Sequence, residues 1–126
     1  MRVFVAGGTG VLGRATLRAL REAGHRVSTT ARGEENARLA RSVGAEPVAV
    51  DLYDGAAVRR AVSGSDAVLR LTTKIPSVTK MGTRGAWTET NRLRTAGARI
   101  LVDAALEERV PVYGLRVCRR RRRVAR

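Results

Sequence analysis

Short apolar runs alternate with amphipathic segments along residues 2–113, and this alternation predicts repeated β–α units. Strands are predicted for the apolar runs at 2–6, 26–30, 46–50, 66–71 and 110–113. Helices are predicted between them, from 11 to 23, up to Gly44, from 54 to 62 and from about 87 to 108. A parallel sheet with helices on both faces buries its strands, which agrees with the short continuous apolar run at 2–6.

Local signals describe two of these helices more closely. Asp54 is expected to cap the third helix, because an aspartate oxygen accepts hydrogen bonds from the free N–H groups of a first turn. In the first helix, arginines and Glu22 should point outward, and an apolar stripe should face the sheet. This stripe consists of Leu12, Ala15, Leu17, Ala19 and Leu20.

A glycine-rich turn joins the first predicted strand to the first predicted helix. Its sequence is Gly7-Gly8-Thr9-Gly10-Val11-Leu12-Gly13. We expect Gly7 to permit the tight turn, Gly10 to let the backbone approach a diphosphate, and Gly13 to let the helix pack closely on the strand. The free N–H groups and the positive dipole end of the helix near Val11 would then attract the anion. The strand–turn–helix context therefore predicts dinucleotide binding, with a purely structural turn as the alternative.

Residues 1 to about 112 resemble the NAD-dependent epimerase/dehydratase-like family, the extended and atypical short-chain dehydrogenase/reductases. The resemblance includes the glycine turn, Val50-Asp51-Leu52-Tyr53-Asp54, the Leu71-Thr72-Thr73 strand end, Asn91 and the helix from Gly97 to Ala105. It implies an α/β fold, a Rossmann-type doubly wound parallel sheet, which here would be truncated after about five strands. The expected division is an incomplete NAD(P)-binding domain at 1–114 and a disordered arginine-rich tail at 115–126.

The same resemblance implies roles for individual residues. In this family, the residue that closes the second strand selects the cofactor. Arg32 at that position would accommodate the 2′-phosphate of NADP, whereas an acid would favour NAD. Asp51 would bond the adenine amino group, Leu52 would pack on the ring, and Thr72 would reach the cofactor. As ordinary residues, Arg32 would be a surface charge, Asp51 a turn-forming acid and Thr72 a strand residue.

The expected cofactor site therefore combines the glycine turn with four later positions, and NADP is its expected ligand, with NAD as the alternative. Its residues are Gly7, Thr9, Gly10, Val11, Leu12, Gly13, Arg32, Asp51, Leu52 and Thr72. No catalytic residue and no metal ligand is expected.

Chemistry in this family uses a tyrosine with a lysine four residues later, and that pair is not recognisable here. Tyr53 is followed at that spacing by Ala57, and Tyr113 by Val117. The only lysines are Lys74 and Lys80. We therefore expect a cofactor-binding domain of an epimerase, dehydratase or oxidoreductase that lacks its own catalytic residues. The alternative is a non-catalytic regulatory protein that senses NADP and signals through a partner.

The net charge of +14 raises the question of a nucleic-acid partner, but half of it comes from residues 115–126. An abrupt change to arginine is typical of a G+C-rich coding sequence read in the wrong frame. The alternative is a basic arm that displaces counterions from phosphates, although no aromatic or helical recognition surface accompanies it. Specific nucleic-acid binding is therefore not expected.

Other features of the composition indicate a soluble cytoplasmic protein. No apolar stretch approaches the roughly 20 residues that a membrane-spanning helix requires. Cys118 is the only cysteine, so neither an intrachain disulfide nor a cysteine-rich metal site can form. The small-molecule substrate is not identified by any residue. An uncovered edge at the fifth strand would expose unpaired backbone groups and favour self-association.

Overall fold

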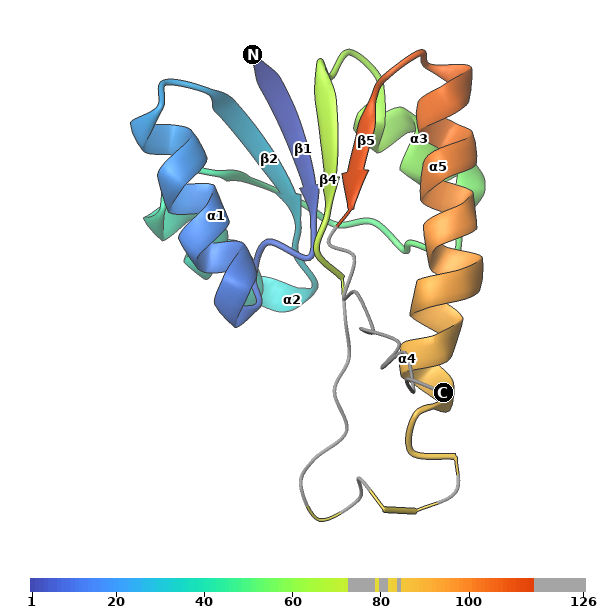
Figure 1. The fold of residues 1–126 in the computed structure, drawn as a ribbon. Helices are drawn as coiled ribbons and strands as arrows, with labels where there is room; N and C mark the ends of the chain where they lie inside the picture. The colour runs from blue at the N-terminus through green and yellow to red at the C-terminus, as the bar shows by residue number, and fades with distance from the viewer. Residues whose placement is uncertain (73–78, 80–81, 84, 115–126) are drawn as a thin grey trace, which may run out of the picture.

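A computed structural model describes residues 1–72, 79, 82–83 and 85–114 of the chain. It contains a five-stranded sheet and helices on both of its faces (Figure 1). The strands are β1 (Arg2–Ala6), β2 (Arg26–Thr30), β3 (Glu46–Val48), β4 (Ala67–Arg70) and β5 (Val112–Gly114). The helices are α1 (Val11–Glu22), α2 (Gly33–Ser42), α3 (Gly55–Val62), α4 (Thr88–Arg92), the π-helical segment η2 (Leu93–Gly97) and α5 (Ala98–Glu107).

The strands are all parallel and follow the order β3-β2-β1-β4-β5. The chain thus moves outward from β1 to one side, then returns to the other side through α3 and β4. This order confirms the predicted Rossmann-type doubly wound sheet. In such sheets, ligands bind outside the carboxyl ends of the strands where the order reverses, which here is beside β1.

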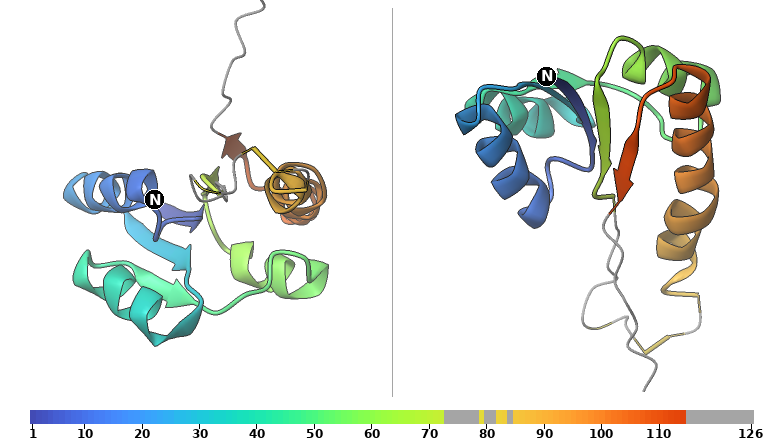
Figure 2. Two further views of the ribbon diagram at one scale, coloured as in Figure 1. Left: turned by 90° about the horizontal axis from the view of Figure 1, so that it is seen from below. Right: turned by 45° about the horizontal axis from the view of Figure 1, so that its top comes forward.

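Alternate residues of β1 point to opposite faces of the sheet, and both faces are covered. Val3 and Val5 belong to the core under α1 and α2. Phe4 and Ala6 belong to the core under α3 and α5. Figure 2 shows the two pairs of helices on either side of the strands. Burial on both faces explains why β1 has a continuous apolar sequence rather than an alternating pattern.

The predicted apolar stripe of α1 is only partly correct. Leu17 is fully buried and Leu20 is half-buried, but Ala15, Ala19 and Leu12 are exposed. The buried line instead begins at Gly13, because α1 approaches the turn before it at a distance that no side chain would allow. Gly13, Leu17 and Leu20 are spaced by four and three residues, which places them on one side of the helix.

The remaining boundaries differ modestly from the predictions. β3 ends at Val48 rather than residue 50, and β5 begins at Val112 rather than residue 110. The last predicted helix is present, but η2 interrupts it, and its α4 end extends past the carboxyl edge of the sheet (Figure 1). The Asp54 cap is confirmed, since its Oδ1 accepts a hydrogen bond from the amide of Ala57 at 3.2 Å.

β5 is an edge strand in the part of the sheet that the structure describes, and Tyr113 on it is 59% exposed. Self-association through this edge stays a prediction. Within the described residues, none of the helices has the length and apolarity needed to cross a membrane. Thr73, Lys74, Lys80 and the arginine-rich tail at 115–126 lie outside the described residues.

Candidate cofactor-binding site

The structure brings the predicted site residues together at the carboxyl edge of the sheet. The glycine turn follows β1, Arg32 follows β2, and Thr72 lies just after β4. Asp51 and Leu52 lie in the loop between β3 and α3. Figure 2, left, looks at this edge along the strands. Residues that are up to 65 positions apart in the sequence therefore lie at one edge of the sheet, because parallel strands all end on the same side.

Two threonines of β2 hold the beginning of the glycine turn. The amide of Gly7 donates to Thr30 Oγ1 at 2.9 Å, and the amide of Gly8 donates to Thr29 Oγ1 at 3.1 Å. The buried Thr29 hydroxyl in turn donates to the carbonyl of Val5 at 2.8 Å. Sequence reasoning missed this support. The available signal was the pair of hydroxyl residues, Thr29 and Thr30, at the end of a predicted strand.

Three of the glycines are required by the protein itself, since a Cβ at Gly8 would overlap Thr29 Oγ1 and those at Gly7 and Gly13 would overlap backbone atoms. Gly7 has a φ of +91°, and a Cβ there would lie 2.7 Å from the backbone nitrogen of Thr72. A Cβ at Gly13 would lie 2.6 Å from the Cα of Gly8, so the first turn of α1 would have to move away. These distances agree with the tight turn and the close helix packing that the sequence predicted for these two positions.

Gly10 is different, because no neighbouring group of the protein requires a glycine there. Its φ of −74° suits any residue, and among the described residues an added Cβ would meet only the carbonyl oxygen of Gly7, at 3.7 Å. The surface beside it is apolar and open: Val11 is 82% exposed and Leu12 is 49% exposed. Space is therefore available directly in front of the amino end of α1.

The amino end of α1 also differs from those of α2 and α3 in its charge balance. α1 begins after Gly10, and its first turn contains no acidic residue. Helix α2 has Glu34 and Glu35 in its first turn, and α3 is capped by Asp54. Because a helix carries partial positive charge at its amino end, α1 can attract an anion that the other two helices balance internally.

Arg32 and Asp51 meet across the ends of β2 and β3. The Arg32 guanidinium lies 3.4 Å from Asp51 Oδ1, and the two side chains are 72% and 58% exposed. Arg32 is also the N-cap residue of α2, and its carbonyl accepts a hydrogen bond from the Asn36 amide group at 2.8 Å. Both predicted selectors of the adenosine half therefore lie in one exposed cluster, within reach of a common ligand.

The loop from Asp51 to Asp54 is a compact turn. Asp51 Oδ1 accepts a hydrogen bond from the amide of Tyr53 at 2.9 Å, and the Asp51 carbonyl accepts one from the amide of Asp54 at 3.0 Å. Leu52 is half-buried and packs against the core under α3 and α5. Asp51 thus forms a turn, which is the alternative to the adenine-binding role expected from the sequence. Its side chain nevertheless stays 58% exposed.

The two tyrosines differ in their surroundings, and both lysines of the chain lie outside the described residues. Tyr113 lies on the edge strand β5, whereas the hydroxyl of Tyr53 is buried. Tyr53 does have a cation, which the sequence spacing did not predict: the Arg92 guanidinium carbon lies 4.0 Å from the centre of its ring. This contact is with the ring face. Among the described residues, no cluster of three or more metal-ligating side chains is placed to hold a metal ion.

Asn91 is exposed on α4, and its carbonyl accepts a hydrogen bond from the Thr95 hydroxyl at 2.7 Å.

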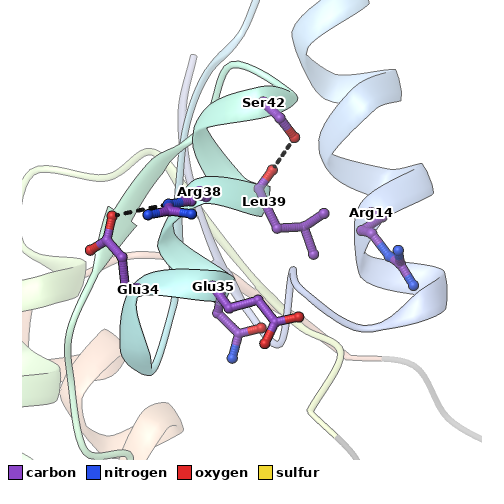
Figure 3. Close-up of a pocket in the computed structure, with 7 residues that line it drawn as sticks. Arg14, Glu34, Glu35, Arg38, Leu39 and Ser42 are labelled. Atoms are coloured by element: carbon purple, nitrogen blue, oxygen red, sulfur yellow. Dashed lines mark hydrogen bonds and ion pairs between the residues drawn. The ribbon is translucent and has the colours of Figure 1, made fainter.

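A separate open groove of about 520 Å³ lies between α1 and α2 (Figure 3). Two of its charged residues, Glu34 and Arg38, pair with each other, and Glu34 also pairs with Arg41 on the same helix. The groove shares no residue with the predicted cofactor site. Its lining is Arg14, Glu34, Glu35, Asn36, Arg38, Leu39 and Ser42.

The strand order and the glycine turn before α1 define the class of the protein as an NAD(P)-binding Rossmann-type domain. The chain belongs to the NAD dependent epimerase/dehydratase family, which it matches over residues 3–116. This assignment confirms the resemblance that was drawn from the sequence. The cofactors of this family are NAD and NADP.

Individual relatives agree with the family. The chain is 39% identical over 107 residues to the 3-diazoavenalumate denitrifying reductase of a Streptomyces species, covering 83% of this chain and 34% of the relative. It is 29% identical over 110 residues to the 4-hydroxy-2-methyl-3-oxo-4-farnesyl-3,4-dihydroquinoline-1-oxide ketoreductase of Stigmatella aurantiaca, covering 87% of this chain and 31% of the relative.

A solved structure of a short-chain dehydrogenase/reductase superfamily protein from Agrobacterium tumefaciens, which contains bound NAD, superposes with a TM-score of 0.68. It is 28% identical, and the match covers 87% of this chain and 30% of that one. The chain thus spans about a third of the length of the relatives that it matches.

Proposed function

We propose that this chain binds NADP at the carboxyl edge of the sheet, with the diphosphate in front of the amino end of α1. The observation that carries the proposal is Gly10, where the protein leaves space that its own packing does not need. A diphosphate in that space would meet backbone N–H groups and the positive end of the helix dipole. Exposed Val11 and Leu12 would be covered by the bound cofactor.

The amides of Gly7 and Gly8 take no part in this proposal, because Thr30 and Thr29 already accept their hydrogen bonds. The segment that would lie along the diphosphate therefore consists of the remaining turn residues, Thr9, Gly10, Val11, Leu12 and Gly13. Thr72 would border the cofactor from the β4 side. It lies next to the glycine turn, since a Cβ at Gly7 would be only 2.7 Å from the backbone nitrogen of Thr72. The threonines of β2 would keep this segment in shape before the cofactor arrives.

For the adenosine half, we propose that Arg32 binds the 2′-phosphate and that Asp51 accepts a hydrogen bond from the adenine amino group. The exposed guanidinium pairs only with another exposed side chain, at 3.4 Å, so it can turn toward a phosphate at small cost. A doubly charged phosphate is also a stronger partner for an arginine than a carboxylate in water. NADP is therefore preferred over NAD, which lacks this group.

Residues 1–114 form the cofactor-binding unit in this proposal, and binding occurs without turnover because no tyrosine is followed by lysine at the family spacing. The relatives are a reductase and a ketoreductase, so the class of reaction proposed for the whole protein is NADP-dependent reduction. A regulatory NADP sensor is the second candidate. A binding partner that is gained or lost on addition of NADP would favour the sensor.

Calorimetric titration of the 126-residue chain with NADP and NAD tests the proposal. NADP is expected to bind more tightly than NAD, and Gly10→Val is expected to abolish binding of both while the protein stays folded by circular dichroism. Gly24→Ala is the matched control: Gly24 has a φ of +86° and lies between α1 and β2, at the opposite edge of the sheet. That variant should lose stability and keep its affinity. Full affinity in Gly10→Val would contradict the proposal.

A further inference from the structure

Tyr53 lies in the loop that presents Asp51, and its backbone and side chain bind in different directions. The backbone amide donates to Asp51 Oδ1 at 2.9 Å, which fixes the rotation of that carboxylate. The ring lies under the Arg92 guanidinium, with 4.0 Å between the guanidinium carbon and the ring centre. Tyr53 therefore links the loop after β3 to a helix that arises about 40 residues later in the chain.

The π-helical segment η2 begins directly after Arg92. Its wider turn is closed by a hydrogen bond from the amide of Ala98 to the carbonyl of Leu93, five residues earlier. In an α-helix, Arg92 and Gly97 would point about 140° apart, because each residue turns the helix by roughly 100°. The π turn brings residues five apart onto the same side. Gly97 is buried there, and a Cβ added to it would lie 3.7 Å from Tyr53 Cε1.

Within the described residues, the hydroxyl of Tyr53 takes no part in the contacts that hold the Tyr53 ring and the loop. It is buried, and no described group forms a hydrogen bond with it. A buried polar group without a partner is unfavourable, so the residue is held by its ring and by its backbone amide. The contact with Arg92 is a cation–π interaction between an exposed cation and a half-buried ring.

We propose that Tyr53 is a positioning residue for the adenosine half of the cofactor site and acts through Asp51. The π turn and Arg92 clamp the Tyr53 ring, the ring fixes the loop, and the loop amide aims the carboxylate that faces the adenine. This inference rests on the proposed function. It adds a residue that is not among the predicted site residues, and it assigns a structural role to the π segment.

The test compares two half-ligands, ADP and reduced nicotinamide mononucleotide, in the 126-residue chain. Tyr53→Leu is expected to weaken ADP binding about fivefold, the size of an exposed cation–π contact, and to leave mononucleotide binding unchanged. Tyr53→Phe should bind ADP like the wild type, and its melting temperature should be equal or higher. Arg92→Gln, which leaves the ring in place, should weaken ADP binding about twofold to threefold. Tyr113→Leu, on β5, is the matched control and should change neither affinity.

A double-mutant cycle separates positioning from general loosening of the fold. In an Asp51→Ala background, Tyr53→Leu should have no further effect on ADP affinity, whereas a purely structural role would weaken binding equally in both backgrounds. Equal losses in both backgrounds, or wild-type ADP affinity in both Tyr53→Leu and Arg92→Gln, would overturn this proposal alone. Failure of the wild-type chain to bind NADP or ADP would overturn the proposed function and this inference together.

Discussion

Arg32 and Asp51, which are 19 residues apart in the sequence, form an ion pair at 3.4 Å between the ends of adjacent strands. Both side chains are more than half exposed, so the pair stabilises the fold by about 0.2–1 kcal/mol at most. An arginine and an aspartate held in such a weak pair are easily separated by a stronger partner. The pair therefore stands as a preformed polar cluster at the place where adenosine is expected.

Removal of Arg32 should change the choice between cofactors. Arg32→Ala is expected to weaken NADP binding about tenfold to hundredfold, the usual range for charged hydrogen bonds to a phosphate. NAD affinity should change by less than about threefold, since NAD lacks the 2′-phosphate. Calorimetric titration with both cofactors measures the ratio. Arg26→Ala, at the other end of β2, is the control for general loss of charge, and an equal loss of NAD and NADP affinity in Arg32→Ala would refute the assignment.

Alanine at Gly13 and alanine at Gly10 should have opposite effects on stability. A Cβ at Gly13 would lie 2.6 Å from Gly8 Cα, so Gly13→Ala is expected to lower the free energy of unfolding by about 1–3 kcal/mol. Gly10→Ala should be neutral or stabilise the protein slightly, because its backbone conformation suits alanine and the Cβ is 3.7 Å from its nearest neighbour. Urea unfolding measures both variants, and similar losses would contradict the assigned roles.

Thr29 should matter more for stability than its position in a strand suggests. Thr29→Val keeps the shape of the side chain but leaves the amide of Gly8 without its partner, at a cost of about 1–3 kcal/mol. Thermal unfolding should show a decrease of roughly 4 °C or more in the melting temperature. The neighbouring half-buried hydroxyl of Ser28 provides the control, since Ser28→Ala should shift the melting temperature much less.

The link between α3 and the end of α5 should weaken in acid. The hydrogen bond from Arg59 Nε, at 2.7 Å, lowers the pKa of the Glu108 carboxyl. A lowered pKa means that the charged carboxylate stabilises the fold above the usual glutamate pKa of about 4.3 and that this contribution is lost as the pH falls through the lower folded value.

Melting curves of the wild type and Glu108→Gln, recorded at neutral and acidic pH, check this expectation. The wild type should be the more stable protein at neutral pH, and the difference should shrink as the medium becomes acidic. Glu22→Gln, on the exposed surface of α1, should show no such convergence. A difference between wild type and Glu108→Gln that is the same at both pH values would contradict the assigned effect of the Arg59 hydrogen bond.

Much of the fold followed from local patterns in the sequence. The continuous apolar run of β1 predicted a buried strand, since burial on both faces leaves no polar side of the strand. The glycine turn predicted its own location beside the sheet, because positive φ at Gly7 and close packing at Gly13 are properties of short segments. The resemblance to the family was also drawn from short segments of the sequence, the glycine turn among them.

The tertiary structure decided what depends on contacts between distant segments. It determined that Gly13, Leu17 and Leu20 form the buried line of α1, that Thr29 and Thr30 hold the glycine turn, and that Arg32 meets Asp51. It also revealed the Arg92 contact on Tyr53 and the π turn next to Arg92, neither of which was predicted from the sequence. Apolar spacing and turn residues act over a few positions, whereas these pairings exist only once parallel strands align their ends.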